Sequence, residues 1–547
     1  MAMEKVVLHR RILLILGAIF LFIYSGLTFI SPSERFNSPD EAAQYFWLSR
    51  LAADRPLSLD EPLNRQVGNV IHSRSDNVTV DGSIVPGSFL GLIIIYGMLA
   101  KLFGLSAVPF FTPLLAVVAI FCFYGLVKRI FNERVALLSA VLLWLQPAWW
   151  YYSSRGLLPN VLFCGLLLIG VWVLVGNYEL RIRNYELRFL KYIFAGLFVG
   201  LALVVRTAEI IWIAPVIVGL VIVYRRQVYW PGLLLFGVVV VLTFIPIIRL
   251  NTQLYGAPWL SGYAHVSDPA PRLVATVGES GAGSFILPFG WHPRVALLNV
   301  WQYYIKMLWW YVVPMAVGFV WLLVNLIKRR ENGEGRREGI QWVYVFIFIF
   351  VTGWLTVYYG SWFIRDNISG HITIGTAYLR YWLPAFMLAV SLAGYALDKL
   401  FTWFHWRASK ILIGIFVFGL YGVLSFNLVF VSEEGLLNVA ESVQAYETIN
   451  RAARQALPPD SIIISDRDDK KFWPEFRVVK LMGDWSVFTK IAPAVSETPV
   501  FYYSHNQLTA EDIRLLNEKA SAGGLRLEEW GSLDGEDRLY QLESQER

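Results

Sequence analysis

Long apolar runs separated by short polar segments dominate the chain. A bilayer core of roughly 30 Å requires about 20 consecutive apolar residues in a helix, and a series of runs approaches or exceeds this length. Together they predict an α-helical polytopic membrane protein. The runs are residues 11–30, 84–104, 106–127, 135–152, 157–176, 192–206, 208–223, 231–250, 300–327, 340–360, 379–397 and 410–432.

The composition agrees with this prediction and excludes other classes. Of the 547 residues, 56% are hydrophobic and 16% are charged, whereas a soluble domain carries about 25% charged residues. A soluble enzyme, a disordered chain and a nucleic-acid-binding protein are therefore excluded, despite a sequence pI near 9.0. The net charge of +6 is unevenly divided: residues 431–547 hold 13 Lys and Arg against 21 Asp and Glu, a net of −8, and the remainder holds 34 against 20, a net of +14.

The basic loops predict the orientation, because Lys and Arg in short loops mark the cytoplasmic side. An even number of crossings must separate the first two basic loops, so one of the three runs between them does not cross. We assign the run 84–104, with Pro86, four glycines and Lys101, to the outer leaflet. The result is about 11 spans in a plasma or inner membrane, with a cytoplasmic amino terminus. The basic loops are Lys5–Arg11, Lys128–Arg134, Arg181–Lys191, Arg225–Arg226, Lys328–Arg337 and Lys399–Lys410.

This topology predicts two domains, a transmembrane domain over 1–432 and a small extracytoplasmic α/β domain over 433–547. The first would carry long extracytoplasmic loops at about 31–105 and 251–299. In the second, the patterns predict helices at about 436–456 and 509–520, strands at 461–465 and 499–503, and a hairpin over 525–540. The charged run Asp466–Asp469 is expected to be a solvated loop, with a binding turn as the alternative.

The tetrad Ser38-Pro39-Asp40-Glu41 opens the first long loop and admits two interpretations. As a helix start, Ser38 is the N-cap, Pro39 takes the first position and Glu41 completes a capping box. Apolar residues at Ala42, Tyr45, Phe46, Leu48 and Leu51 would then give an amphipathic helix along the membrane. This interpretation gives Asp40 no required role. The alternative is that Asp40, fixed at a rigid helix start, acts as a general base.

Several basic residues fall at predicted outer span ends, where the orientation rule disfavours them. Any one of them can simply extend to the membrane surface, and Arg206 with Glu209 three residues on can be a structural pair. Convergence of several guanidinium groups would instead suit a phosphate. The candidate phosphate ligands are Arg155, Arg206, Arg365, His371 and Arg380.

These features together resemble the membrane glycosyltransferases of the GT-C fold. The resemblance rests on the acidic pair after the first span, the aromatic-rich outer loops and the sequence Arg380-Tyr381-Trp-Leu-Pro384. The segment 86–104, ending in Leu-Phe-Gly, is similar to the family's Pro-rich outer segment, although the usual Lys-Pro-Pro is absent. The protein O-mannosyltransferase (family 39), the lipid A aminoarabinose transferase and the bacterial lipopolysaccharide-core glycosyltransferase groups are the most similar, over about residues 10–400.

The resemblance implies an inverting glycosyltransferase of the cell envelope with a sugar donor linked to polyprenyl phosphate. By analogy, Asp40 would deprotonate the acceptor hydroxyl and Glu41 would orient the site. The arginines and His371 would stabilise the leaving phosphate. The acceptor can be a glycan, a lipid or a protein. Some GT-C enzymes use a divalent metal, but the sequence offers no clear ligand set, so we assign no metal or other cofactor.

Two rival functions remain open at this stage. A transporter or flippase for lipid-linked saccharide would also need a membrane groove and cations, but transporters commonly show repeated spans and broken helices near the midplane. The sequence shows no repeated set of spans. A non-catalytic scaffold that presents the C-terminal domain would leave the outer arginines unexplained.

Overall fold

Contacts between residues divide the chain into two compact units. The computed structural model describes residues 2–30, 34–176, 185–263, 287–331, 336–363, 372–404 and 406–545. The helical unit comprises Met1–Leu27, Pro109–Ile245 and Arg272–Asn438, and the sheet unit comprises Thr28–Val108, Pro246–Pro271 and Val439–Arg547. The predicted division into 1–432 and 433–547 stays a prediction. By its contacts, the first long loop belongs to the same unit as Val439–Arg547, the C-terminal segment.

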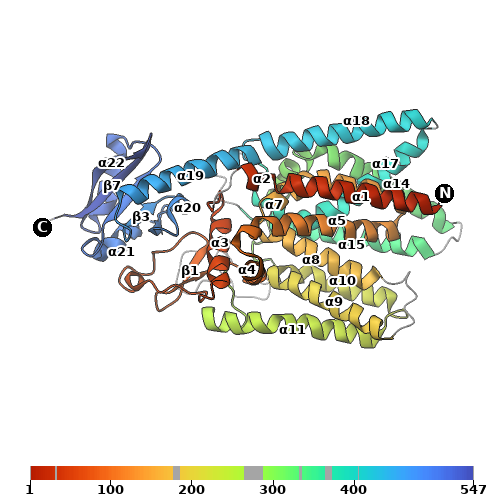
Figure 1. Cartoon of the computed structure of the whole chain (residues 1–547), viewed down its shortest axis with the longest axis horizontal. Helices are drawn as coiled ribbons and strands as arrows, with labels where there is room; N and C mark the ends of the chain where they lie inside the picture. Colours follow the sequence, from red (N-terminus) through yellow and green to blue (C-terminus); the bar gives the residue numbers. More distant parts are fainter. Residues whose placement is uncertain are drawn as a thin grey trace. The chain divides into compact units, whose positions relative to one another are not determined.

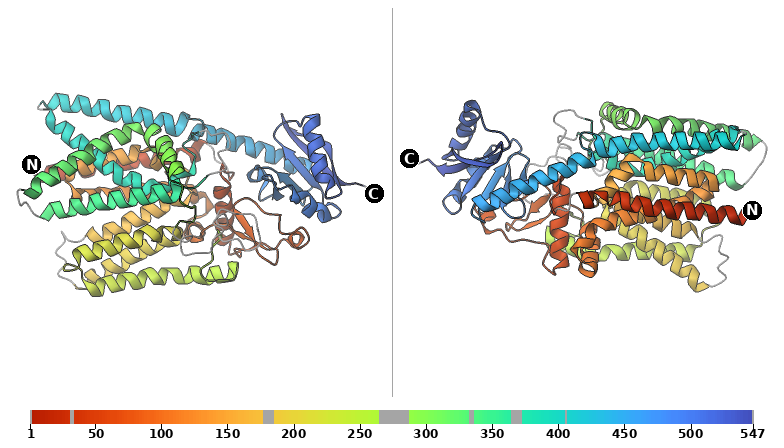
Figure 2. Two further views of the ribbon diagram at one scale, coloured as in Figure 1. Left: turned by 180° about the vertical axis from the view of Figure 1, so that it is seen from behind. Right: turned by 45° about the horizontal axis from the view of Figure 1, so that its top comes forward.

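The helical unit is built from long apolar helices that run side by side (Figures 1 and 2). Their backbone groups bond within each helix, as a segment in lipid requires. Seven described helices are long and apolar enough to cross a membrane, or eight if a bent pair counts as one span. Residues 11–24, 159–175 and 189–205 form shorter apolar helical stretches. The helices are α1 (Ala2–Tyr24), α5 (Val108–Ile130), α6 (Glu133–Leu145), α7 (Pro147–Ser154), α8 (Pro159–Gly176), α9 (Tyr185–Val205), α10 (Ile210–Tyr224), α11 (Trp230–Tyr255), α14 (Trp309–Glu331), α15 (Arg336–Gly360), α17 (Leu383–Trp403) and α18 (Arg407–Phe426).

Short elements connect these helices where the chain leaves the apolar runs. Because they interrupt the long helices, they can carry charged side chains such as Glu209 in η3 and Arg380 in α16. They are α2 (Gly26–Ile30), the 3-10 turn η3 (Thr207–Glu209), α13 (Pro293–Asn299), the π-helical turns η4 (Val300–Lys306) and η5 (Asn427–Val431), and α16 (Ala377–Tyr381).

The predicted span 135–152 is a bent pair, α6 and α7, with an angle of 53° between the two helices. Gln146 lies at the bend with extended backbone angles, and its side-chain oxygen accepts a 2.6 Å hydrogen bond from the Trp149 N–H. Pro147 takes the first position of α7, where a missing N–H costs nothing. The bend therefore starts a second short helix, which carries Tyr151 and Tyr152 and is followed by its C-cap, Arg155.

Helix α17 is the most buried of the candidate spans, with 83% of its apolar window inside the protein. Glycines permit the close approach of its neighbours. A Cβ at Gly394 would collide with Ser139 of α6, and one at Gly318 of α14 would lie 2.0 Å from the Leu392 carbonyl oxygen. Arg380 and Tyr381 directly precede this central helix.

The sheet unit contains a five-stranded mixed sheet in the order β4-β3-β5-β7-β6. Strand β3 pairs in parallel with β4 and β5, whereas β7 pairs antiparallel with β5 and β6. The helices predicted at 436–456 and 509–520 are present, but β4 and α21 were not predicted. The elements are α19 (Leu436–Ala456), β3 (Ile462–Ser465), α20 (Asp469–Phe472), β4 (Arg477–Lys480), α21 (Ser486–Val495), β5 (Val500–Ser504), α22 (Ala510–Ser521), β6 (Leu525–Asp534) and β7 (Asp537–Ser544).

The first long loop packs into the same hydrophobic core as this sheet. Leu63, Val67 and Ile71 are buried among apolar residues of β3, β4 and β5, and Ile71 forms an antiparallel bridge with Val479 at the β4 edge. The loop thus covers a strand edge that would otherwise be exposed. Its elements are α3 (Pro39–Ala52), η1 (Pro62–Arg65), β1 (Asp76–Val78), β2 (Ile84–Pro86), α4 (Gly91–Phe103) and η2 (Leu105–Ala107).

Helix α3 buries a different face from the one expected. Ala43, Gln44, Trp47 and Leu48 are buried together with Glu41, so only Leu48 belongs to the predicted apolar face. The reason is tertiary: Gln44 and Trp47 hydrogen-bond to Ser88 and Asp76 of the same loop, which turns their face of the helix inward. Helix α4 has 13 residues, about 20 Å of helix, which is shorter than a span.

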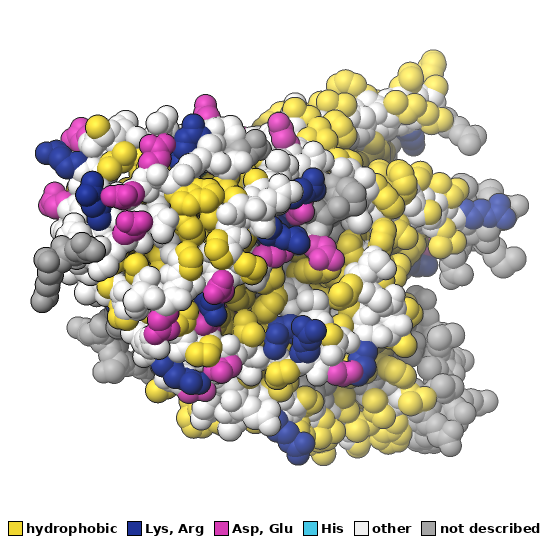
Figure 3. Space-filling model, turned by 60° about the vertical axis from the view of Figure 1, so that its left-hand side comes forward, with side chains coloured by type: hydrophobic (Ala, Val, Ile, Leu, Met, Phe, Trp, Pro, Cys, Tyr) yellow, Lys and Arg dark blue, Asp and Glu magenta, His cyan; other side chains and the backbone are white. Residues whose placement is uncertain are grey.

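The surface of the sheet unit carries charges of both signs. Figure 3 brings this unit forward and shows Lys and Arg side chains interspersed with Asp and Glu, with hydrophobic side chains between them. Mixed charges of this kind suit a surface in contact with water.

Candidate active site

Asp40 lies in the first turn of α3, as the sequence predicted. The N-cap Ser38 has an extended backbone, and its hydroxyl oxygen accepts a hydrogen bond of 3.3 Å from the Asp40 N–H. The Asp40 carboxylate is half-buried and accepts a 2.8 Å hydrogen bond from the Ser75 hydroxyl. This hydroxyl fixes one carboxylate oxygen of Asp40 at the start of α3.

Two further polar side chains of α3 lie close to Asp40 in sequence. Glu41 is buried, with 4% of its surface exposed. Gln44, one helical turn after Asp40, donates a 2.8 Å hydrogen bond to the Ser88 hydroxyl, and its side-chain oxygen is buried with no partner among the described residues. A buried polar atom of this kind calls for an explanation such as a ligand. Spacing from Asp40 is the only sequence signal that could have indicated Gln44.

The turn 73–76 faces α3. Asp76 is buried and accepts hydrogen bonds of 2.6 Å from the Trp47 indole N–H and the Ser73 hydroxyl. Burial raises the pKa of the Asp76 carboxyl to about 6, although both hydrogen bonds and Lys480 act to lower it. Asn77, the sequon residue of Asn-Val-Thr, is also buried and donates to the Gly262 carbonyl, so its amide is not exposed for glycosylation.

The raised pKa of Asp76 predicts a pH-dependent stability. A carboxyl that binds its proton more tightly in the folded state makes the free energy of unfolding fall as pH rises from about 4 to about 6. The total loss should be about 3 kcal/mol. Thermal melting of wild type and Asp76→Asn between pH 4 and pH 7 checks this: the wild type should become more stable on acidification, and the variant should lose that part of the dependence. Equal pH slopes in both proteins would contradict it.

Tyr152 in the helical unit has two arginines, Arg155 and Arg380, in its electrostatic surroundings. Both guanidinium groups, and the Glu434 carboxylate, lie close enough to the Tyr152 hydroxyl to interact with it electrostatically. Arg155 is buried and donates to the Tyr151 hydroxyl at 2.9 Å. The Tyr152 hydroxyl in turn donates at 3.0 Å to the Ile374 and Thr376 carbonyl oxygens. It thereby holds the start of α16, the helix that carries Arg380.

Arg206 joins the same neighbourhood through Tyr381. The guanidinium carbons of Arg206 and Arg380 lie 4.8 Å and 5.2 Å from the centre of the Tyr381 ring. Three of the five candidate phosphate ligands are thus gathered by α7, the α9–η3 junction and α16. The other two, Arg365 and His371, lie outside the described residues.

Arg206 also forms a buried ion pair with Glu209, the structural alternative raised by the sequence. The nearest nitrogen and oxygen are 2.7 Å apart, and both side chains are at most 6% exposed. The Tyr359 hydroxyl donates to Glu209 at 2.6 Å, and the Trp212 indole N–H donates to it at 2.5 Å. The charge of Arg206 is therefore already balanced, which suits a supporting role beside Arg380.

Removing Glu209 should destabilise the protein strongly. Glu209→Ala leaves the Arg206 guanidinium buried without its carboxylate, and breaking such a pair costs about 3–5 kcal/mol. The double variant Arg206→Met/Glu209→Leu should recover most of the loss, because apolar replacements of buried pairs are often neutral. Thermal melting in detergent checks both variants. A double variant as unstable as Glu209→Ala would show that the pair is not what holds this region.

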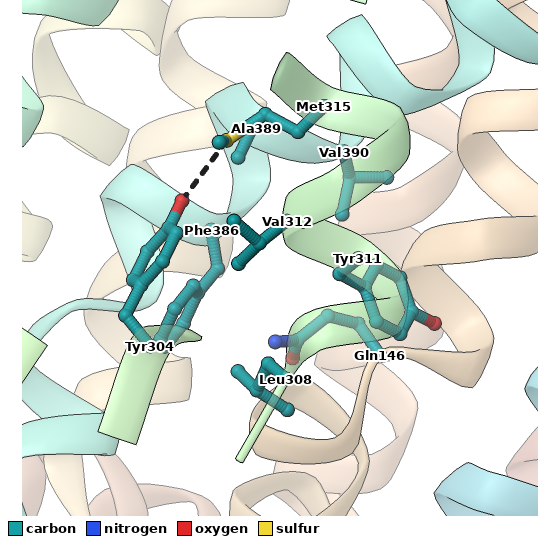
Figure 4. A pocket seen from close by; sticks show the side chains of 9 residues that line it. All are labelled: Gln146, Tyr304, Leu308, Tyr311, Val312, Met315, Phe386, Ala389 and Val390. Carbon is teal, nitrogen blue, oxygen red and sulfur yellow. Dashed lines mark hydrogen bonds between the residues drawn. The ribbon is translucent and has the colours of Figure 1, made fainter. Parts of the chain in front are cut away.

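Two cavities in the described part of the helical unit are lined by residues other than these arginines. The one in Figure 4 has a volume of about 10 Å³, room for about one water molecule, and its walls are mostly apolar, with Gln146 at one side. An open groove of about 390 Å³ lies between η4 and the end of α18 and includes Lys306. Within the described part of the chain, no group of three or more His, Cys, Asp and Glu residues could hold a metal ion.

Comparisons with known proteins identify the fold. A sequence model of the dolichyl-phosphate-mannose-protein mannosyltransferase family matches residues 90–249. Among solved structures, ArnT from Cupriavidus metallidurans bound to undecaprenyl phosphate superposes with a TM-score of 0.56 at 12% identity, covering 99% of this chain and 98% of that one. The oligosaccharyltransferase of Archaeoglobus fulgidus in its apo form gives 0.51 at 14% identity, covering 91% and 69%. A search of curated protein sequences finds no match.

The chain therefore has the GT-C fold of membrane glycosyltransferases, and the predicted resemblance is confirmed. The matched segment of the mannosyltransferase family runs from α4 into α11. The predicted fold class, a polytopic helical protein with a small C-terminal α/β region, is confirmed as well.

Proposed function

We propose that this protein is an inverting glycosyltransferase that moves a sugar from a polyprenyl-phosphate donor to an acceptor hydroxyl at the extracytoplasmic membrane face. The observation that carries the proposal is the position of Arg155 at the end of α7 and of Arg380 on α16, the helix whose start Tyr152 holds, in a chain of this fold. Guanidinium groups at span ends match the phosphate of a lipid donor, whose prenyl chain needs the membrane. The undecaprenyl phosphate bound to ArnT is consistent with such a donor.

In the proposed reaction, the Asp40 carboxylate takes the proton of the acceptor hydroxyl. The acceptor oxygen forms a bond to the anomeric carbon as the bond from that carbon to the phosphate oxygen breaks. The polyprenyl phosphate leaves with the electron pair, and attack from the opposite face inverts the anomeric configuration. Arg155 and Arg380 stabilise the charge that develops on the phosphate, together with Arg365 and His371.

Glu41 and Arg206 take supporting parts in this scheme. Buried Glu41 orients the first turn of α3, which carries Asp40. Arg206, paired with Glu209, supports the Tyr381 ring beside Arg380. Because its charge is already balanced, its contribution to phosphate binding is smaller than that of Arg380.

A transfer assay tests the proposal. Purified full-length protein is given undecaprenyl phosphate carrying radiolabelled mannose, glucose or galactose, together with envelope lipid, envelope glycan or envelope protein. We expect label to move from the donor to one acceptor fraction. No transfer from any donor, combined with movement of intact lipid-linked sugar across vesicles, would favour a transporter or flippase instead.

The proposed orientation makes a separate prediction. Glu511 on α22 is 86% exposed at its side chain, and both native cysteines are buried. In intact cells, Glu511→Cys should react with a membrane-impermeant maleimide, because the proposed orientation has the C-terminal segment outside. The matched control is Arg134→Cys, at the start of α6, which should react only after lysis. The reverse labelling pattern would overturn the orientation.

A further inference from the structure

We propose that the C-terminal segment positions the Asp40 carboxylate, acting through Asp469, Arg74 and Ser75. The proposal rests on the proposed function, in which Asp40 is the base. Asp469, Arg74 and Ser75 are positioning residues, since none of them has to touch the substrate. All four lie in the sheet unit, although Asp469 follows Arg74 by 395 residues.

The first link joins the C-terminal segment to the turn 73–76. Asp469, the first residue of α20, is completely buried. Its carboxylate accepts hydrogen bonds from the Arg74 backbone N–H at 2.8 Å and from the Arg74 side chain at 2.6 Å. Arg74 also donates at 2.6 Å to the Arg467 carbonyl oxygen. Because the buried Asp469 carboxylate binds both the backbone and the side chain of Arg74, it fixes the turn in place.

The second link joins this turn to α3. Ser75, directly after Arg74, donates to the Asp40 carboxylate at 2.8 Å. Asp76 accepts from Trp47 at 2.6 Å. Asp40 and Trp47 are seven residues apart and hence on one face of the helix. The adjacent residues Ser75 and Asp76 thus bind Asp40 and Trp47, two positions on one face of α3. These two contacts set both the rotation of the helix and the direction of the Asp40 carboxylate.

The C-terminal segment also holds the chain that leads into α3. Buried Arg35 donates to the Trp473 carbonyl oxygen at 2.9 Å and pairs with Glu475 at 2.6 Å. Lys470 donates to the Asn37 carbonyl oxygen, one residue before the N-cap, at 2.6 Å. Helix α20 and the residues after it therefore contact both the entry to α3 and the turn that binds Asp40.

This arrangement matters because a base must lie within hydrogen-bond reach of the proton that it removes. A misplacement of about 1 Å caused by a mutation remote from the chemistry can cost about 100-fold in rate. Loosening the turn should therefore lower kcat. Binding of the donor phosphate should not weaken, because that binding is assigned to Arg155 and Arg380.

The test compares Asp469→Asn and Ser75→Ala with the control Glu61→Gln in full-length protein. Glu61 pairs with Arg477 at 2.9 Å, so it also joins the first long loop to the C-terminal segment, and its other side-chain hydrogen bond goes to the Leu63 N–H rather than to the turn. The assay uses undecaprenyl-phosphate mannose, glucose or galactose, whichever the wild type accepts. A second readout is hydrogen exchange of peptides covering residues 36–48 and 70–78, which needs no activity.

We expect Asp469→Asn and Ser75→Ala to lower kcat by about 10- to 100-fold while the KM for the donor stays within about twofold. In Ser75→Ala, the acidic limb of the pH–rate profile should move to higher pH, because a carboxylate that loses a donor takes up a proton more readily. The double variant Ser75→Ala/Asp469→Asn should lose less kcat than the product of the two single losses, because both residues act on the same carboxylate. Exchange should quicken in both peptides of Asp469→Asn, and Glu61→Gln should match the wild type.

Each alternative outcome decides the question. If Asp469→Asn and Ser75→Ala have the same kcat and the same pH–rate profile as Glu61→Gln, the positioning role is overturned, even if hydrogen exchange quickens. Unchanged exchange in Asp469→Asn would overturn the link itself. Should Asp469→Asn fail to fold, Ser75→Ala, which leaves the buried ion pair intact, decides through kcat and the pH profile. A wild type with no transfer activity defeats the proposed function instead, and the exchange data then decide whether Asp469 holds α3.

Discussion

Asp40→Asn should reduce kcat for sugar transfer by about 10²- to 10⁴-fold, the usual contribution of a positioned base. The substitution keeps the shape of the side chain and an oxygen that can accept from the Ser75 hydroxyl, so the start of α3 should remain folded. An amide cannot take the proton of the acceptor hydroxyl, and the loss should therefore fall on kcat rather than on donor binding.

Initial rates at saturating donor measure this effect, with undecaprenyl phosphate binding measured on the same samples. Asp60→Asn is the matched control, because Asp60 lies in the same loop, pairs with Arg65 at the surface and has a side chain that is 62% exposed. It should keep wild-type activity. Transfer that survives in Asp40→Asn would remove Asp40 from the role of base.

Arg380→Gln should weaken binding of undecaprenyl phosphate by at least about 30-fold. Removing one partner of a hydrogen-bonded charge pair costs about 2–5 kcal/mol, and 1.4 kcal/mol is a factor of ten. Arg380→Lys should restore little, because an ammonium cannot form the planar, two-pronged contact that a guanidinium makes with phosphate. Arg155→Gln should act in the same direction, since Arg155 shares the Tyr152 neighbourhood.

Equilibrium binding of undecaprenyl phosphate in mixed micelles checks this prediction. Arg134→Gln is the control: Arg134 is exposed at the start of α6, in a loop predicted to be cytoplasmic, and its loss should leave the affinity unchanged. Equal affinities for Arg380→Gln and the wild type would place the phosphate elsewhere.

The membrane helices could be predicted because their cause is local. A segment in lipid must satisfy its own backbone and be apolar over a set length. The runs 231–250 and 340–360 correspond to α11 and α15. The bend between α6 and α7 was missed, although Gln146 and Pro147 carry a signal for it: an N-cap side chain followed by proline is typical of a helix start.

In the C-terminal segment, short elements escaped prediction. Strand β4 has four residues and begins and ends with the charged Arg477 and Lys480, so no apolar alternation is visible. Helix α21 contains Pro493, which argues against a helix. Asp469 was expected in a solvated loop and is completely buried. Its partner Arg74 is hundreds of residues away, which no local pattern reveals.

Only the part of the candidate site that has a local sequence signal could be predicted. Asp40 is part of a helix-start signal of only four residues. Arg155 and Arg380 are basic residues at predicted outer span ends, where the orientation rule disfavours them. Tyr152, Ser75 and Gln44 carry no such signal. Their roles depend on contacts such as that between Tyr152 and Ile374, 222 residues apart, and these exist only in the folded protein.

In the proposed reaction, the protein breaks the bond between sugar and phosphate and forms an inverted glycosidic bond. NMR of the reaction with the accepted undecaprenyl-phosphate sugar measures both events at once, through phosphorus signals of the carrier and the anomeric proton of the product. We predict one free undecaprenyl phosphate for each sugar transferred, with the anomeric configuration of the product opposite to that of the donor. A product that retains the donor configuration, or donor that stays intact while it crosses vesicles, would contradict the account.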